Sequence, residues 1–316
     1  DRTIDIVGKS GLKRIMNFDS DSLKYNYDYK PDILSRYGRI FSKDNIGKYS
    51  SKINHICNNV MSSTGIVIIY SQYIEGGVIP IALALEERGF SRYSTSNNVK
   101  PLFKTPPVEP IDSIHMKPKS DIGKNVFKRA RYVLITGDSH FSQSNAEDMK
   151  FITNKKNADG SQVKVVIISK AASEGLDFAN VRQVHILEPW YNLNRIEQII
   201  GRGVRNLSHC SLPFEKRNVE LYLYTFKPIV FDDTKLELAD MYVYRLAEKK
   251  AKLIGNVTRL LKENSIDCYL NIAQTNLSMD KFKELSDNNI VDIQLSSNKK
   301  IKYTIGDRPF SSVCDY

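Results

Sequence analysis

Residues 163–206 read VKVVIISKAASEGLDFANVRQVHILEPWYNLNRIEQIIGRGVRN, and the rest of the chain is organised around them. Residues 163–169 are a run rich in β-branched side chains, which is typical of a strand covered on both faces. A short loop containing a glycine follows at 169–177, and 184–187 is a second short apolar run. This order predicts parallel strands whose polar loops converge on one edge of a sheet, where ligands bind.

Residues 194–207 are predicted to form a helix, in which each residue turns by about 100°. Its apolar residues then share one stripe, formed by Ile196, Ile200, Val204 and Leu207. The opposite stripe carries Arg195, Gln198, Arg202 and Arg205. Guanidinium groups match phosphate oxygens bidentately, and the glycines between these arginines favour a close approach of phosphate or backbone. The alternative, from the helix alone, is a solvated basic face.

Two motifs in this stretch carry a family resemblance. The sequence SKAASEGLD at 169–177 resembles motif V of superfamily 2 helicases and translocases. The sequence QIIGRGVR at 198–205 resembles their motif VI, whose pattern is Gln-x-x-Gly-Arg-x-x-Arg, and EPWYN at 188–192 resembles a segment of the Swi/Snf-type branch. In the details of its sequence outside these motifs, the chain is similar to helicases of large nucleocytoplasmic DNA viruses. It is most similar to the type that is related to the early transcription factor large subunit.

The predicted fold class is α/β. Strands are expected at 65–70, 131–136, 163–169, 184–188 and 220–226, alternating with helices. This alternation predicts a RecA-like parallel sheet with helices on both faces and right-handed crossovers. The expected domains are an interdomain connection at 1–44, a second RecA-like helicase C-terminal lobe at 45–231, and a tail at 232–316. The tail is expected to be mainly helical, with a small hairpin at 291–305.

Several local features are also predicted. Helices are expected at 45–62 and 78–88, the second with Gly89 as its C-cap, and a capping box formed by Ser144 and Glu147 is expected to start another. Residues 91–130 contain five prolines and are interpreted as an inserted, mobile surface loop. This loop either contacts nucleic acid or is only solvated. Its basic residues include Lys117, Lys119, Lys124, Lys128 and Arg129, and Arg131 follows directly.

The resemblance implies a role for individual residues. The implied catalytic residues, which face the γ-phosphate of ATP, are Gln198, Arg202 and Arg205. Gly175 and Asp177 are implied to bind the nucleotide, with Asp177 on the ribose. The implied contacts to the nucleic-acid backbone are Ser71, Gln72, Gly137, Ser169, Lys170 and Trp190.

Two motor motifs are missing from the sequence. It has no Gly-x-x-x-x-Gly-Lys-Ser/Thr loop and no acidic box for Mg²⁺ after a strand. ATP and Mg²⁺ are therefore expected to be bound mainly by a first lobe absent from this chain, which alone should lack ATPase activity. The chain begins at Asp1, so we expect it to be part of a longer protein.

The expected partners are nucleic acid, with DNA favoured over RNA, an N-terminal RecA-like lobe and viral transcription machinery. The alternative is a non-catalytic RecA-like scaffold that binds nucleic acid in a transcription complex. A motor of a restriction or packaging enzyme would need a nuclease or terminase segment, and the sequence contains none.

Composition agrees with these expectations without deciding between them. The net charge is +10 and the pI is about 9.2, which favours a nucleic-acid partner modestly. The four cysteines and five histidines lack zinc-ligand spacing, so no metal site is predicted and the thiols are expected to be reduced. No apolar run approaches the length of a membrane span. We expect an intracellular protein, in the host cytoplasm or the virion if it is viral.

Overall fold

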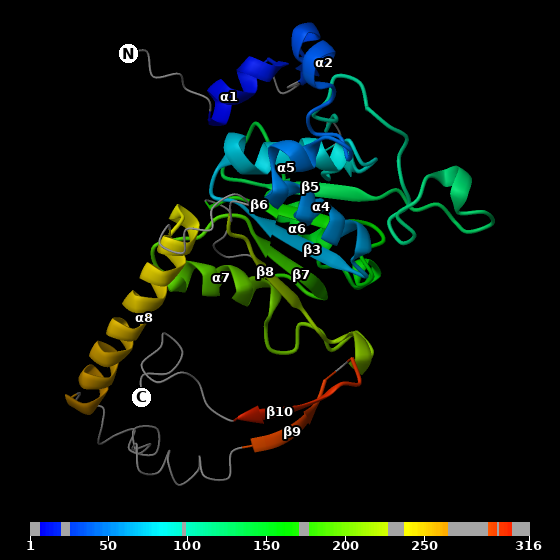
Figure 1. Cartoon of the computed structure of the whole chain (residues 1–316). Coiled ribbons are helices and arrows are strands. Elements are labelled where there is room, and N and C mark those ends of the chain that lie inside the picture. The colour runs from blue at the N-terminus through cyan, green and yellow to red at the C-terminus, as the bar shows by residue number, and fades with distance from the viewer. Residues whose placement is uncertain are drawn as a thin grey trace, which may run out of the picture. The chain divides into compact units, whose positions relative to one another are not determined.

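The computed structural model describes residues 7–19, 26–96, 99–170, 177–226, 237–264, 290–295 and 297–304 (Figure 1). The chain divides into two compact units. The first comprises Asp1–Glu188, Ile199–Leu212 and Val219–Thr225, and the second comprises Pro189–Gln198, Pro213–Asn218 and Phe226–Tyr316. The domain boundaries predicted from the sequence stay predictions, and residue 231 lies outside the described residues.

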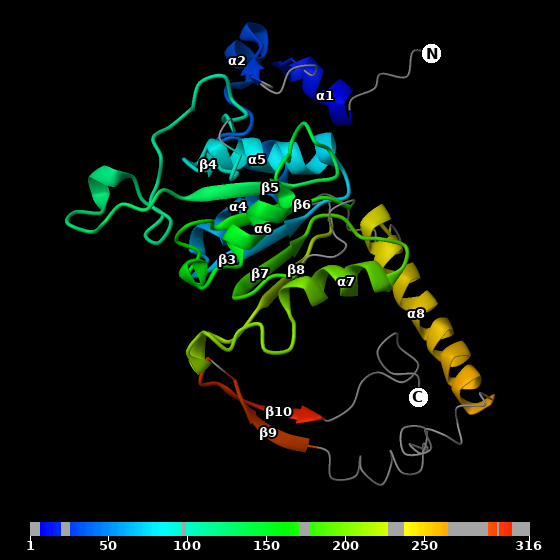
Figure 2. The same cartoon turned by 180° about the vertical axis from the view of Figure 1, so that it is seen from behind.

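The first unit is built on a parallel sheet of six strands, in the order β4-β5-β6-β3-β7-β8 (Figures 1 and 2). The strands are β3 (Ile66–Tyr70), β4 (Ser91–Arg92), β5 (Arg131–Ile135), β6 (Val165–Ile168), β7 (Val181–Ile186) and β8 (Glu220–Leu223). The predicted RecA-like α/β sheet is thereby confirmed. Strands β3 and β6 are buried along their whole length, because their side chains are apolar on both faces.

Helices cover both faces of this sheet. One face of β3 presents Val67 and Ile69 to the core that contains α4 (Ser51–Ser62) and α5 (Ile79–Glu86). On the other face, Ile68 lies beneath Gly203 at the carboxyl end of α7 (Leu193–Gly203). The alternation along one strand therefore fixes which helices lie above and below the sheet.

The predicted helices around β3 form with small differences at their ends. The helix expected at 45–62 is split into α3 (Ile46–Tyr49) and α4, because Ser50 is extended and its Oγ accepts a hydrogen bond from the Ile53 amide at 3.3 Å. A π-helical turn at Ile74–Val78 precedes α5. Gly89 has φ +88°, which confirms it as the C-cap.

The capping box predicted at Ser144 is wrong. Helix α6 (Asn145–Ile152) begins where expected, but the Ser144 side chain makes no capping hydrogen bond. Its ψ of 42° is not the extended value of an N-cap, so its hydroxyl is not directed at the first turn. The Asn145 side chain instead donates to the Thr136 carbonyl at 3.0 Å, which ties the start of the helix to the end of β5.

The amino-terminal segment contributes to the core of the first unit. It contains α1 (Gly8–Ile15), a small antiparallel pair of β1 (Met16–Asn17) and β2 (Asp28–Tyr29), and α2 (Pro31–Tyr37). The hydroxyl of the buried Tyr29 donates to Glu87 at 3.0 Å, and Arg39 forms an ion pair with the same carboxylate at 3.0 Å. The segment interpreted as an interdomain connection is therefore fastened to α5 and its carboxyl end.

Part of the 91–130 segment is also core rather than exposed loop. Leu102 and Phe103 are buried, and their amides donate to the carboxylate of Glu86 at 2.8 and 3.0 Å. The Tyr132 hydroxyl donates to the same carboxylate at 2.7 Å. Burial raises the pKa of Glu86, against the opposing effect of these hydrogen bonds. The prediction of a wholly exposed loop is wrong for these residues, because a buried carboxylate anchors their backbone.

The second unit contains the helical extension. Helix α8 (Ala239–Asn264) is a single helix of 26 residues, which confirms the predicted helical character of the tail. Strands β9 (Ile290–Gln294) and β10 (Lys300–Thr304) pair antiparallel, and Asn298 between them has φ +61°. Among the described residues, no helix combines the length and the hydropathy that crossing a bilayer requires.

Candidate functional site

Asp177, Arg202 and Arg205 converge at the carboxyl end of α7. Arg205 Nη1 forms an ion pair with Asp177 Oδ1, and Arg202 Nη1 lies 3.6 Å from the same oxygen. The side chains of Asp177 and Arg205 are 62% and 48% exposed, whereas that of Arg202 is 20% exposed. Two positive charges and one negative charge leave this group with a net charge of +1, so it can accept an anionic ligand from solvent.

The helix that carries these arginines is shorter than predicted. It ends at Gly203, so Arg205 lies in the following turn and not on the helix. The buried residues of α7 are Ile196, Ile199 and Gly203, whereas Val204 and Leu207 are exposed. Ile200 lies in the helix and is half-buried, so the predicted apolar stripe is wrong only from Val204 onwards, because the helix ends at Gly203.

Gly203 is required by packing rather than by a ligand. A Cβ atom added to it would lie 2.8 Å from Val184 Cγ2 and 3.3 Å from Val181 Cγ1. A Cβ at Gly201 would meet open space instead. The expectation that both glycines admit a phosphate is thus not supported at Gly203, where the sheet itself approaches the helix.

The turn after α7 is fastened to the start of β7 by side chains that the sequence did not single out. His209 Nε2 donates to the Val181 carbonyl at 2.6 Å, and the Asn180 amide donates to the Ser208 carbonyl at 3.0 Å. Ser208 Oγ accepts a hydrogen bond from the Arg205 amide at 3.3 Å. We call residues 205–209 the arginine turn. His209 thus holds the backbone that presents Arg205.

The predicted polar residues do not all lie on one edge of the sheet. Ser71, Gly137 and Ser169 follow the carboxyl ends of β3, β5 and β6, whereas Asp177 precedes the amino end of β7. The strands are parallel, so these are opposite edges, separated by roughly 20 Å along a six-residue strand. The prediction of a single convergent edge is wrong, because Asp177 lies just before the start of β7 and the carboxyl end of α7 brings Arg202 to it.

Ser71 is buried and its side chain is already engaged. Its Oγ donates to Glu188 Oε1 at 2.8 Å, and the amide of Gln72 donates to Glu188 Oε2 at 3.2 Å. Ser71 therefore has no exposed side-chain surface with which to contact nucleic acid, and its implied role needs this correction. Glu188, which sequence reasoning assigned only to a motif, organises the turn that presents the partly exposed Gln72.

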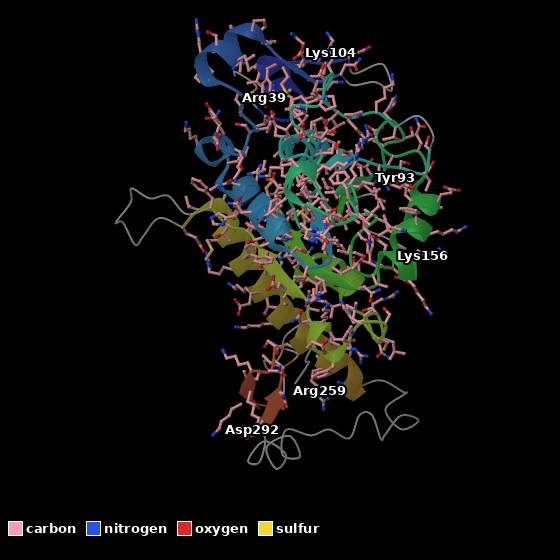
Figure 3. The ribbon with its side chains drawn as sticks, turned by 90° about the vertical axis from the view of Figure 1, so that its right-hand side faces the viewer. Arg39, Tyr93, Lys104, Lys156, Arg259 and Asp292 are labelled. Carbon is pink, nitrogen blue, oxygen red and sulfur yellow. The ribbon has the colours of Figure 1, made fainter. Side chains whose placement is uncertain are left out.

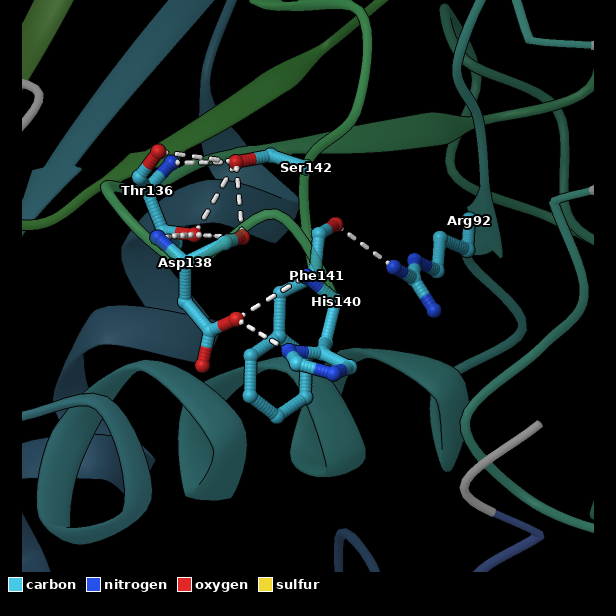
Figure 4. A network of polar contacts seen from close by, with 6 residues as sticks. All are labelled: Arg92, Thr136, Asp138, His140, Phe141 and Ser142. Atoms are coloured by element: carbon cyan, nitrogen blue, oxygen red, sulfur yellow. Dashed lines mark hydrogen bonds and ion pairs between the residues drawn. The ribbon is translucent and has the colours of Figure 1, made fainter. Parts of the chain in front are cut away.

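Gly137 lies in an exposed turn that a polar network holds in place (Figure 4). The Thr136 amide donates to Ser142 Oγ at 2.9 Å, and the Asp138 amide donates to Thr136 Oγ1 at 3.2 Å. Asp138 Oδ1 also accepts from the His140 amide at 2.9 Å. The backbone around Gly137 is thus fixed at the carboxyl edge, where Lys170 is exposed and Ser169 is buried.

The other three predicted residues are Gly175, Gln198 and Trp190. Gly175 lies outside the described residues. Gln198 is exposed and lies about one helical turn before Arg202 in α7. In the second unit, the Arg195 guanidinium lies over the Trp190 ring at 3.9 Å from its centroid. Arg195 therefore stacks on Trp190 and is not part of the Asp177 group.

Neither metal-binding nor disulfide chemistry is prominent in the described residues. In that part of the chain, no group of three His, Cys, Asp or Glu side chains could hold a metal ion. Cys57 is buried and Cys210 is exposed, and both are free thiols. Burial raises the pKa of the Cys57 thiol to about 11, so it remains protonated near neutral pH.

Comparisons with known proteins agree with the two motifs. Residues 115–206 match the model of the helicase conserved C-terminal domain, and this range contains both motif-like segments. The chain is 42% identical over 120 residues to a putative ATP-dependent RNA helicase of Acanthamoeba polyphaga mimivirus, which covers 37% of the chain and 15% of that protein. It is 29% identical over 279 residues to a termination factor NPH-I homolog of African swine fever virus, which covers 82% of the chain and 38% of that protein.

A second putative ATP-dependent RNA helicase of the mimivirus is 27% identical over 254 residues, covering 74% of the chain and 22% of that protein. The chain thus spans between 15% and 38% of the length of these relatives. Among solved structures, the C-terminal part of the Fun30 ATPase domain aligns with a TM-score of 0.40 and 12% identity, covering 69% of this chain and 51% of that one. The resemblance to the conserved C-terminal domain of helicases, and to helicases of large DNA viruses, is confirmed by the domain and sequence matches.

Proposed function

We propose, from the helicase C-terminal domain that residues 115–206 match, that this chain is the second motor lobe of an ATP-dependent nucleic-acid helicase or translocase. The observation that carries the proposal is the pair Arg202 and Arg205 around Asp177. This chain has the arginine face but no phosphate-binding loop. The arginines would therefore contact a nucleotide that is bound by another lobe. Gln198 would lie beside this face, one turn earlier in the helix.

The geometry of this group fits the γ-phosphate of ATP. Two guanidiniums offer several N–H donors to phosphoryl oxygens, and in the transition state negative charge spreads over those oxygens. Before nucleotide binds, Asp177 holds Arg205 in an ion pair. A phosphate that attracts Arg205 would release this carboxylate to accept hydrogen bonds from the ribose hydroxyls. The contribution of Gly175 to nucleotide binding stays a proposal from the sequence motif. Mg²⁺ would be held mainly by the first lobe.

We propose that the nucleic-acid backbone binds at the carboxyl edge of the sheet, opposite the edge that carries Asp177. Gln72, Gly137 and Lys170 lie at the carboxyl ends of adjacent strands and offer amide, backbone and ammonium donors. Contacts of this kind go to the phosphodiester backbone, so binding would be independent of sequence and weakened by salt. Trp190, in the second unit, is proposed as a further contact. Hydrolysis would remove the charge that attracts the arginines and so couple the ATP cycle to this grip.

The relatives' names suggest the setting. Two of them are named putative ATP-dependent RNA helicases and one is named a homolog of a termination factor. We propose a role in viral transcription, with double-stranded DNA as the track because of the Swi/Snf-like segment at 188–192. Viral transcription machinery would be the protein partner.

ATP hydrolysis by the longer protein that contains this chain tests the proposal. A first lobe that carries the phosphate-binding loop should hydrolyse ATP slowly by itself and much faster when joined to this chain, with further stimulation by DNA. Equal rates with and without the chain would contradict the proposal. That result would favour a non-catalytic scaffold that binds nucleic acid.

Replacing Asp177→Ala in that protein should raise the KM for ATP by about tenfold, because a hydrogen bond to a charged group contributes roughly 1.5–3 kcal/mol. The variant should also lose the wild-type preference for ATP over 2′-deoxy-ATP, as measured by kcat/KM for both nucleotides. Asp32→Ala, at an exposed position of α2, is the matched control. If Asp177→Ala lowers only kcat and keeps the preference for ATP, then the carboxylate orients the arginines and does not hold the ribose.

A further inference from the structure

A basic pocket lies at the amino ends of β5 and β6, in the first unit. Its volume is about 460 Å³, and it is lined by Phe127, Lys128, Arg129, Arg131, Lys156, Ser161 and Gln162. Four of these side chains are cationic, and none of the described lining residues is acidic. They come from the end of the 91–130 segment, the start of β5 and the turn before β6. Four like charges around one opening favour an anionic ligand.

One wall of the pocket is built on a buried carboxylate. Asp112 is fully buried, and its Oδ1 accepts a hydrogen bond from the Lys128 amide at 2.7 Å. Its neighbour Ser113 is also buried, and the Ser113 amide donates to the Lys128 carbonyl at 2.7 Å. Ser113 Oγ in turn donates to the Ser161 carbonyl at 3.0 Å. The backbone that carries Lys128 is therefore fixed from both sides and joined to the opposite wall.

The opposite wall is built on a buried amide. Asn157 is fully buried, and its Oδ1 accepts from the amides of Gln162 and Val163, both at 2.9 Å. Its Nδ2 donates to the carbonyls of Ile152 and Val163 at 3.0 and 3.1 Å. Lys156 directly precedes Asn157, so its backbone is held in the same turn. The buried, fully hydrogen-bonded side chains of Asp112 and Asn157 fix the backbone of both walls. The pocket therefore has a defined geometry and is not formed only by flexible lysines at the surface.

The floor of the pocket includes an arginine with a fixed position. The Arg131 guanidinium lies over the Tyr93 ring, 4.9 Å from its centroid, and Tyr93 packs against Phe151. Tyr93 and the pocket residue Lys156 are labelled in Figure 3. A carboxylate, Asp159, lies close by, and its Oδ1 accepts from the Ser161 amide at 2.9 Å. The two carboxylates, Asp112 and Asp159, balance only part of the four positive charges. The pocket therefore keeps a net positive charge.

We infer that this pocket binds phosphates of the nucleic-acid backbone, as a contact additional to the carboxyl edge. The inference rests on the proposed nucleic-acid function. Arg131 begins β5 and Gly137 lies two residues past its end, so the two contacts are six residue steps apart, or about 20 Å along the strand direction. One strand of a duplex has a phosphate every 3.4 Å of axis, so about six phosphates span this distance. The half-buried ring of Phe127 adds an apolar surface for a sugar or base.

The test compares two double variants of the full chain by fluorescence anisotropy with a short labelled DNA duplex. Lys128→Gln with Lys156→Gln removes two pocket charges. Lys9→Gln with Lys13→Gln removes two exposed charges of α1, which lie outside the pocket, so the net charge is matched. The pocket variant should bind about tenfold or more weakly, and the slope of log affinity against log salt should fall by about two. The matched variant should keep the wild-type affinity and slope.

Equal weakening in both variants would overturn the inference, because bulk charge would then explain binding. The pocket variant could instead lose binding of inorganic phosphate, measured by calorimetry, yet keep its affinity for the duplex. That result would also overturn it, since the site would then serve a free anion. Lys170→Gln distinguishes this inference from the proposed function. If Lys170→Gln weakens duplex binding and the pocket variant does not, the proposed nucleic-acid contact at the carboxyl edge is supported and the proposed contact at the pocket is contradicted.

Discussion

Replacing Arg205→Ala is expected to lower ATP hydrolysis by the assembled motor by about 10³–10⁵-fold, the usual contribution of an arginine finger. The side chain is half exposed and its ion-pair partner, Asp177, is more exposed still, so its loss removes little buried structure. Circular dichroism and the melting temperature of the chain should therefore stay near the wild type. The measurement is steady-state turnover of ATP with saturating DNA in the protein that contains both lobes.

Two further variants define the cause of this loss. Arg205→Lys keeps the charge but not the planar fork, so it should recover only a small part of the rate. Arg36→Ala removes an arginine from an exposed position of α2 and should leave turnover unchanged. Wild-type turnover in Arg205→Ala would refute the arginine-finger assignment. An equal loss in Arg36→Ala would show that the assay reports general charge and not the γ-phosphate contact.

The arginine turn shows where sequence reasoning reaches its limit. The motif at 198–205 predicted the residue types, and the periodicity predicted a helix through them. Two hydrogen bonds hold the chain where that helix ends. His209 donates to the Val181 carbonyl in β7, and the Arg205 amide donates to Ser208 Oγ. A local sequence pattern does not predict these bonds. Arg202 and Arg205 still meet at Asp177, because the turn brings Arg205 back towards the helix end.

The strands were predictable because their chemistry is local. Continuous apolar runs of four or five residues mark β3, β5 and β6, whereas β7 has a mixed sequence that includes Arg182, Gln183 and His185. All four strands lie within the predicted ranges or within three residues of them. The 91–130 segment was less predictable, since its prolines suggest a loop whatever it packs against. Its anchor is Glu86, a charged residue in α5 that becomes fully hydrogen-bonded only when residues 102 and 103 fold over it.

The site residues at the carboxyl edge show the same contrast between features that local sequence predicts and features that depend on distant contacts. The position of Ser71 after a buried strand was predicted, but its burial was not, because that depends on Glu188, which follows the end of β7 more than a hundred residues later. A signal was available in the sequence, since a carboxylate directly after an apolar run needs donors nearby. The donors turn out to be Ser71 and the amide of Gln72.

Acidification from about pH 7 to about pH 5 is expected to destabilise the first unit through His185 by about 2 kcal/mol. His185 is fully buried in β7, and this burial lowers its pKa from 6.5 to about 4, against the raising effect of Glu220. The folded state therefore binds the proton more weakly than the unfolded state. Its contribution to stability is fully present above about pH 6.5 and is lost progressively as the pH falls towards about 4.

The hydrogen bonds around His185 explain why the charged form is disfavoured. Gln183 Oε1 can only accept, so His185 Nε2 donates to it at 3.2 Å, and Nδ1 must accept from the Tyr224 hydroxyl at 2.8 Å. Tyr224 in turn accepts from Asn59 at 3.3 Å, and the Tyr222 ring stacks on the imidazole. A second proton on His185 would leave the Tyr224 hydroxyl without its acceptor in a buried network.

The measurement is urea unfolding of the full chain at several pH values, compared with His185→Gln. Glutamine can donate and accept in place of the imidazole but does not titrate, so the variant should show a stability loss about 2 kcal/mol smaller between pH 7 and pH 5. Carboxylates elsewhere titrate in both proteins and cancel in the difference. His140→Gln, at an exposed position in the turn after β5, is the matched control and should follow the wild type. Parallel curves of unfolding free energy against pH for wild type and His185→Gln would contradict this prediction. They would mean that water or a rearranged Tyr224 stabilises the protonated imidazole, so that protonation of His185 does not destabilise the fold at low pH.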